Sequence, residues 1–168
     1  YSEVSSNKVL DWHVDQAYSG NLNPKKFLDP NHAALKYFVY LTDVSSNNGC
    51  LGYIPGSHKI LYFLKFGILN GTIKYKPYWR LGDLRKIVQD EHYSGYLQTK
   101  INKELIDEFL DKTSFIVNSP HDTQKYDYDL KAGSALIFDE AGVHRGAETL
   151  KTPRLVVRFT YKDINASD

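Results

Sequence analysis

The sequence has little of several features that would point to a particular compartment or partner. Its 168 residues include one cysteine, Cys50, so no disulfide can form within the chain, which favours a reducing compartment. The formal net charge is +1 at pH 7, which provides no electrostatic basis for binding nucleic acid or an anionic membrane. No apolar run approaches the roughly 20 residues that are needed to span a bilayer.

The start of the sequence lacks two further features. No basic segment is followed by an apolar one, so no secretory signal peptide is visible, and we expect a cytoplasmic protein without nucleic-acid or membrane partners. The sequence contains no methionine, not even an initiator, so we expect it to begin inside a longer protein. Its length favours a single domain over residues 1–168.

What the sequence does contain is a set of short β-rich segments near its two ends. Alternating side chains predict a strand over 34–42, followed by a turn at 45–49 and a short strand over 50–54. This arrangement predicts a β-hairpin. Further strands are expected over 134–138 and 154–161.

The middle of the chain, about 60–129, shows no sustained period and is interpreted as a variable, partly helical insertion. Asp83 is expected to cap a short helix that ends at Val88, and Asn102 to cap a second helix over 103–111. Long irregular excursions in compact domains are usually lids or binding loops, although an ordered but passive insertion is the alternative.

The last predicted strand has one apolar face, formed by Leu155, Val157, Phe159 and Tyr161. We expect missing N-terminal helical sequence, or a partner, to cover this face. Several short strands with turns between them predict a mainly β fold, a double-sheet jelly roll or double-stranded β-helix of the cupin-like kind.

The tripeptide His13-Val14-Asp15 is a candidate for part of a metal site. On an extended segment, His13 and Asp15 project to the same side, and together they form two-thirds of a 2-His-1-carboxylate triad. Such a triad holds non-haem Fe(II) and leaves coordination positions open. The tripeptide alone is weak evidence, because an ordinary His and Asp on an exposed strand would give the same pattern.

A third ligand would have to come from a distant histidine. His144 follows the predicted strand 134–138, and ten residues later Arg154 opens the last strand. An arginine there could bind one carboxylate of a dicarboxylic cosubstrate bidentately while the other end chelates the metal. Taken separately, His144 could be a loop histidine and Arg154 a surface ion-pair partner, but the two in this order after His-x-Asp favour a common site. The other histidines have no such context: His32, His58, His92 and His121.

With these residues in view, the sequence resembles the phytanoyl-CoA dioxygenase family of Fe(II)/2-oxoglutarate-dependent oxygenases, which includes ectoine hydroxylase-like enzymes. The resemblance runs through WHVD (12–15), AALKYFVYLTDVSSNNGCLGYIPGSHK (33–59) and AGSALIFDEAGVHRGAETLKTPR (132–154). The stretch LTDVSSNNGCLGYIPGSHK (41–59) is its most specific part. The insertion does not match.

The resemblance implies that His13, Asp15 and His144 ligate iron and that Arg154 binds the C5 carboxylate of 2-oxoglutarate. Phe38 stands where the family often has tryptophan beside the cosubstrate, and it would pack there without the indole hydrogen bond. The spacing from His144 to Arg154 is one residue shorter than in better-known members, and Arg158 is the alternative partner of that carboxylate.

The resemblance also implies an activity. A dioxygenase of this family uses molecular oxygen and 2-oxoglutarate to hydroxylate a small-molecule substrate, with succinate and CO2 as coproducts. Related halogenases have a small residue at the position of Asp15, so its carboxylate favours hydroxylation over halogenation. His58 would then belong to a turn rather than to the iron site.

Two other functions fit the same residues. A non-catalytic cupin-like protein could bind a metal or a small ligand with this fold, and the loss of any of His13, Asp15, His144 or Arg154 would favour it. A metalloenzyme of the same architecture without a cosubstrate would leave Arg154 without a role. All four residues are present, so the dioxygenase is the prediction.

Overall fold

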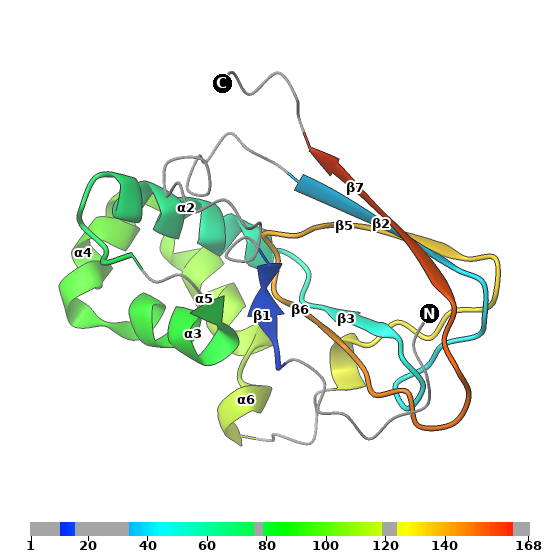
Figure 1. The fold of residues 1–168 in the computed structure, drawn as a ribbon. Helices are drawn as coiled ribbons and strands as arrows, with labels where there is room; N and C mark the ends of the chain where they lie inside the picture. Colours follow the sequence, from blue (N-terminus) through cyan, green and yellow to red (C-terminus); the bar gives the residue numbers. More distant parts are fainter. Residues whose placement is uncertain (1–10, 16–33, 76–78, 119–123, 163–168) are drawn as a thin grey trace.

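The computed structural model describes residues 11–15, 34–75, 79–118 and 124–162 (Figure 1). The strands are β1 (His13–Val14), β2 (Ala34–Tyr40), β3 (Leu51–Tyr53), β4 (Trp79–Arg80), β5 (Ala135–Asp139), β6 (His144–Gly146) and β7 (Val156–Lys162). The helices are α2 (Ser57–Leu69), α3 (Leu81–Gln89), α4 (Glu91–Lys100), α5 (Lys103–Lys112) and α6 (Phe115–Asn118).

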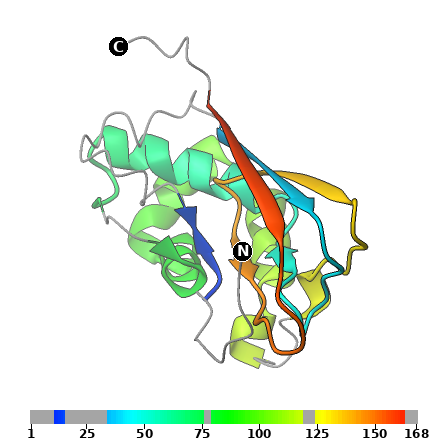
Figure 2. The ribbon, with the colours of Figure 1, turned by 45° about the vertical axis from the view of Figure 1, so that its right-hand side comes forward.

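The strands form two antiparallel sheets. One has the order β5-β2-β7, with Tyr37 of the central strand facing Ile137 on one side and Phe159 on the other. In the second view, β7 and β2 run side by side along their length (Figure 2). The strands predicted over 34–42, 134–138 and 154–161 are therefore confirmed, with ends that shift by one or two residues.

The other sheet has the order β3-β6-β1-β4. The predicted β-hairpin is wrong, because β3 pairs with β6 rather than with β2. The turn expected at 45–49 is present, and the main-chain N–H of Asn48 donates to the Ser45 carbonyl at 2.8 Å. This turn carries the chain from one sheet to the other. Local pattern located the strands and the turn, but it could not identify strand partners about 90 residues away in the sequence.

The insertion, interpreted as partly helical, contains more helix than the two helices that were predicted. Asn102 caps α5 as expected, accepting the main-chain N–H of Leu105 at 3.0 Å. Asp83 lies in the first turn of α3 rather than before it, and its carboxylate accepts the N–H of Arg80 at 3.1 Å. Helix α2 was missed because Pro55-Gly56 was interpreted as a strand end, although it is also where the helix begins.

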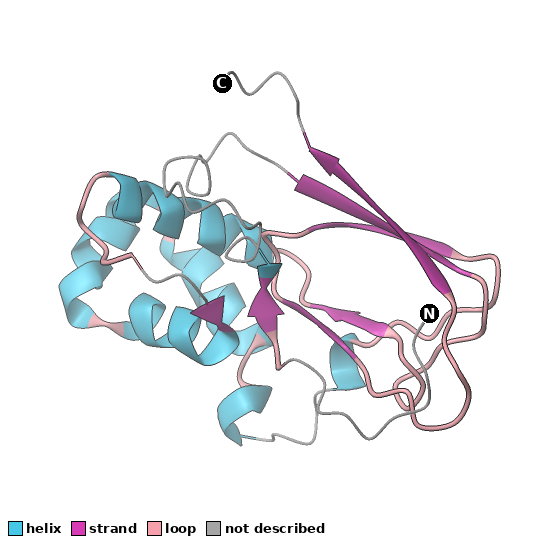
Figure 3. Cartoon of the chain, in the orientation of Figure 1, coloured by secondary structure: helices cyan, strands magenta, loops and turns pink. Residues whose placement is uncertain are grey.

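Helices and the β1–β4 pair share one hydrophobic core. Trp12, Val14 and Trp79 pack with buried side chains of the helices, such as Leu64 and Leu84. Figure 3 shows the helices gathered on one side of the molecule and the three-stranded sheet on the other. This core anchors β1, the strand that starts with His13.

The described residues form a mixed structure of helices and antiparallel sheets, with more residues in helices than in strands. The predicted predominance of β structure underestimated the helices of the insertion. Within the described ranges the two sheets close no barrel, so the jelly roll stays a prediction. None of the described helices is both long enough and apolar enough to cross a membrane.

Candidate metal centre

The pairing of β1 with β6 brings two histidines from opposite ends of the chain together. His13 and His144 are direct Cα partners in this antiparallel pair, so their side chains project to the same side of the sheet. Their ring centroids lie 4.8 Å apart. Both residues are buried, with exposed fractions of 3% and 5%.

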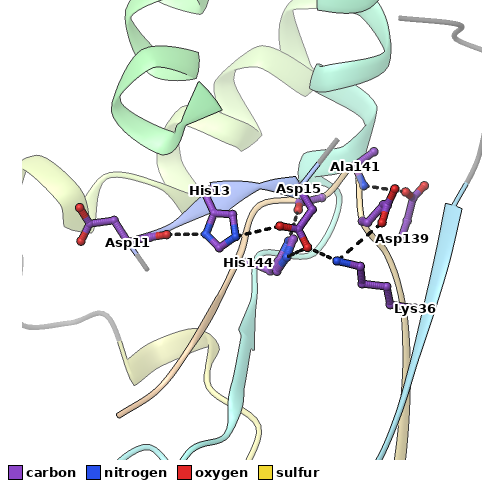
Figure 4. Close-up of polar contacts among 9 residues, drawn as sticks. Asp11, His13, Asp15, Lys36, Asp139, Ala141 and His144 are labelled. Atoms are coloured by element: carbon purple, nitrogen blue, oxygen red, sulfur yellow. Dashed lines mark hydrogen bonds and ion pairs between the residues drawn. The ribbon is translucent and has the colours of Figure 1, made fainter. Parts of the chain in front are cut away.

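Asp15 is the residue directly after β1, and it completes the group of candidate ligands. Its Oδ1 lies 3.2 Å from Nε2 of His13, and its Oδ2 lies 3.2 Å from Nε2 of His144 (Figure 4). The possible ligand atoms of the three residues all lie within 4.8 Å of one another. The structure therefore brings together the three residues that the sequence singled out as candidate metal ligands.

Main-chain carbonyls orient both imidazoles. Nδ1 of His13 lies 2.6 Å from the Asp11 carbonyl oxygen, and Nδ1 of His144 lies 2.8 Å from that of Gly142. A carbonyl oxygen only accepts, so each Nδ1 carries the hydrogen and each Nε2 presents its lone pair toward Asp15. Burial lowers the pKa of both rings, that of His144 to about 3, so both are neutral at neutral pH.

This donor set fits a divalent metal ion. Two imidazole lone pairs and a carboxylate converge with no hydrogen left to share among them, an arrangement that a cation between them stabilises. Two nitrogen ligands and one carboxylate oxygen are the combination found in facial triads of non-haem Fe(II). The residues present therefore suit iron, with the carbonyls of Asp11 and Gly142 holding the imidazoles in place.

The three-stranded sheet supplies the opposite wall of this site. The Phe138 ring lies 5.2 Å from the His144 ring and 5.2 Å from the Phe38 ring. Phe38 thus lies one aromatic ring away from the candidate metal ligands. Phe138 is a residue that sequence reasoning missed, although its place on the predicted strand 134–138 was a usable signal.

Arg154 lies further along the inner face of the three-stranded sheet, which is the face that carries Phe38 and Tyr40. One of its guanidinium nitrogens donates to the Gly49 carbonyl at 2.8 Å, and the arginine is close enough to Tyr40 to influence that hydroxyl. Burial raises the pKa of Tyr40 to about 12, and the charge of Arg154 acts in the opposite direction. Tyr40 in turn packs on Phe38, with ring centroids 6.3 Å apart. The half-buried Arg154 is thus linked to the triad through a row of aromatic rings, whereas Arg158, across from Phe38, is exposed.

Lys36 is the most important residue that the sequence analysis left without a role. It is only 7% exposed, its ammonium group contacts Oδ2 of Asp15, and it lies 3.6 Å from a carboxylate oxygen of Glu140. The sequence did contain a signal that Lys36 has a charged partner. Lys36 shares a strand face with Phe38, and a charged residue among inward-facing aromatic side chains needs a partner of opposite charge.

Tyr53 and Tyr62 form another missed part of the wall. Tyr53 is the Cα partner of His144, and the Tyr62 hydroxyl donates to Asp139 at 2.7 Å. Burial raises the pKa of both hydroxyls, and the nearby Asp139 carboxylate acts in the same direction. Both tyrosines are therefore neutral hydrogen-bonding groups near the site.

Among the described residues, the candidate ligand group includes neither His58, His92 nor Cys50. His58 is in α2, with Nδ1 3.5 Å from the Tyr53 hydroxyl, and His92 is exposed in α4. His32 and His121 lie outside the described residues. Cys50 is fully buried, as expected for a small apolar side chain, and burial raises its pKa to about 12.

Comparison with known proteins agrees with these residues. The model of the phytanoyl-CoA dioxygenase family matches residues 3–154, a range that includes the three candidate ligands and Arg154. The resemblance found in the sequence is thereby confirmed. Searches of curated proteins and of solved structures gave no match.

Proposed function

The chain belongs to the phytanoyl-CoA dioxygenase family, and we propose that it is an Fe(II)/2-oxoglutarate-dependent dioxygenase that hydroxylates a small-molecule substrate. The observation that carries the proposal is the convergence of His13, Asp15 and His144, with both histidine lone pairs directed at the same point as the carboxylate.

In this proposal the three residues hold the iron and their surroundings keep them in the required state. The Asp11 and Gly142 carbonyls keep each Nε2 free of hydrogen, and burial keeps the imidazoles neutral. No protons must therefore leave the histidines when a metal ion binds near neutral pH. The carboxylate of Asp15 occupies the position where a halogenase would leave room for chloride.

Arg154 and Phe38 are the proposed cosubstrate residues. A guanidinium can bind a carboxylate bidentately, and its bond to the Gly49 carbonyl holds the side chain along the inner face of the sheet. Phe38 provides an apolar surface between this arginine and the triad, through its contacts with Tyr40 and Phe138. Such a surface would exclude water from the reacting end of the cosubstrate.

When bound, iron and 2-oxoglutarate would supply the oxidation, with oxygen consumed, succinate and CO2 released, and a C–H bond of the substrate hydroxylated. The protein's contribution is geometric and electrostatic. His13, Asp15 and His144 would fix the ion, Arg154 would orient the cosubstrate, and the aromatic wall would keep the site dry.

The proposed fold is a jelly roll in which the two described sheets face each other. The rings of Phe138 and Tyr53, one from each sheet, lie 5.7 Å apart, which supports such a face-to-face arrangement. The four-stranded sheet would carry the metal ligands and the three-stranded sheet the cosubstrate residues.

The test is an anaerobic titration of the metal-free protein with Fe(II) and then 2-oxoglutarate. The chelate of cosubstrate and iron is expected to give a weak visible charge-transfer band, which Asp15→Ala and His144→Ala should abolish. Arg154→Leu should shift the half-saturation to higher 2-oxoglutarate concentrations without preventing iron binding. Iron binding without a band would reject the cosubstrate and favour a metal-binding protein without this activity.

A further inference from the structure

Lys36 lies between two carboxylates at the candidate metal centre. Its ammonium group contacts Oδ2 of Asp15 (Figure 4). Oε2 of Glu140 lies 3.6 Å from the same ammonium nitrogen. The side chains of Lys36 and Glu140 are each 9% exposed, and that of Asp15 is 20% exposed. Charges in such surroundings are weakly screened, so each of them depends strongly on its neighbours.

The fold restricts where this ammonium group can go. Lys36 is in the central strand β2, and its cross-strand neighbours Phe138 and Thr160 flank it on both sides. Asp15 and Glu140 are held close together, because the main-chain N–H of Asp15 donates to the Glu140 carbonyl at 3.4 Å. Both carboxylates are already within ion-pair distance of the ammonium group, so a rotation of the lysine side chain would suffice to move it from one to the other.

Lys36 and a metal ion would compete for the same carboxylate. The oxygen that contacts Lys36 is the one that lies 3.2 Å from Nε2 of His144, and Asp15 is a proposed ligand. An ion held by this group would repel an ammonium group that stayed on Asp15. Glu140 offers that ammonium group a second acceptor, already within ion-pair distance.

We propose that Lys36 is a positioning residue that holds Asp15 in the metal-free protein and moves to Glu140 when the metal ion binds. The exchange between the two carboxylates then sets the affinity of the site for metal. This inference rests on the proposed function, because it takes His13, Asp15 and His144 as the metal ligands.

Metal affinity provides a direct test, with Co(II) as the probe in calorimetric titrations of the full chain near neutral pH. Lys36→Met keeps the length of the side chain and removes the charge, so Co(II) should bind roughly tenfold more tightly, within the usual range for coupling between sites. Glu140→Gln removes the negative charge of the second acceptor, so Lys36 stays on Asp15 and Co(II) should bind more weakly by a similar factor. Circular dichroism melts of each variant check that it is folded.

The double variant separates exchange from a simple change in charge. If Glu140 acts through Lys36, then Lys36→Met/Glu140→Gln should bind Co(II) as tightly as Lys36→Met alone. If the two charges act independently, the opposite effects should cancel and the double variant should resemble the wild type, which would overturn the proposal. Asp139→Asn is the matched control, because it removes the adjacent carboxylate, which bonds to Tyr62 instead of Lys36.

Two failures are distinguishable. If the wild type binds no Co(II), or binds it equally well after His144→Ala, the proposed metal centre itself is wrong. If the wild type binds Co(II) through the triad but Glu140→Gln has no more effect than Asp139→Asn, only the role of Lys36 is rejected. The Glu140→Gln measurement decides this even if Lys36→Met does not fold.

Discussion

The two faces of the sheet β5-β2-β7 are built from the same strands but have different surroundings. On the inner face Tyr40, Phe138 and Lys36 are at most 7% exposed, and Phe138 and Lys36 contact residues of the candidate metal centre. On the outer face Phe159 and Tyr161 are 57% and 59% exposed. Both faces are rich in aromatic side chains, so residue type alone does not distinguish them.

The comparison shows that burial on a sheet depends on what lies opposite each face. The four-stranded sheet covers the inner face, and this makes charged contacts such as that of Lys36 with Asp15 strong. The outer face includes the apolar side chains that alternate along the last strand, such as Phe159 and Tyr161. The expectation that a further segment or partner covers it stays a prediction.

Phe138→Ala should have the largest effect on stability. The ring is buried among Phe38, Tyr53 and His144, so its removal should lower the free energy of unfolding by about 3–5 kcal/mol. Urea unfolding followed by tryptophan fluorescence measures this loss. A loss below about 1 kcal/mol would mean that the two sheets are not packed together through this ring.

Acid should destabilise the metal-free protein through His144. Its pKa is about 3 in the fold and near 6.5 in the unfolded chain, so the unfolded chain takes up the proton first as the pH falls. The contribution of His144 to the free energy of unfolding is therefore fully present well above pH 6.5 and is lost as the pH falls. At about pH 5 the loss from this one group should be about 2 kcal/mol. Urea unfolding in the presence of a chelator, at about pH 5 and at a pH above 6.5, should show a smaller pH dependence for His144→Asn than for the wild type. An equal dependence in both proteins would contradict the buried, neutral histidine.

Gly49→Ala should have a smaller effect on stability and a specific effect on the cosubstrate. Gly49 has φ 73°, and an added Cβ would lie 2.8 Å from Cδ of Arg154. Gly133→Ala is the matched control, with φ 87° and no atom within 4 Å of the added Cβ. Both should lose about 1–2 kcal/mol from the left-handed backbone. Only Gly49→Ala should also weaken 2-oxoglutarate binding in the anaerobic titration, because its Cβ displaces Arg154. Equal 2-oxoglutarate affinities of the two variants would contradict a role of Arg154 in cosubstrate binding.

Phe159→Ala should have the smallest effect. The ring is largely exposed on the outer face and faces Tyr37 across the strands, so the loss should stay within about 1 kcal/mol. The measurement is the same urea unfolding as for Phe138→Ala. A loss as large as that of Phe138→Ala would show that the outer face is covered in the protein.

Much of the candidate site could be predicted from the sequence. His13 and Asp15 are two residues apart, and on an extended segment this spacing places both side chains on one side. His144 and Arg154 were selected by their positions relative to predicted strands, and the family match includes all four residues. Helix α5 was also predictable, because Asn102 is a strong cap before an amphipathic stretch.

Other features could not be predicted from local pattern. Helix α2 was not predicted, because Pro55-Gly56 is as typical of the end of a strand as of the start of a helix. The partner of β3 is a strand that lies far away in the sequence, and a turn next to a strand predicts a neighbour only when the chain folds straight back. The contacts of Lys36 were not predictable either, because its partners Asp15 and Glu140 belong to two other segments of the chain.

The sequence by itself determined the family, the strands that alternate and the identity of the candidate ligands, because spacing along one chain decides which side chains can share a face. Only the tertiary structure decided which strands pair, which face of the three-stranded sheet is buried, and that Lys36 meets the carboxylate of Asp15. The physical reason is that these properties depend on contacts between residues distant in sequence. The same alternating strand can turn either face inward until another sheet packs against it.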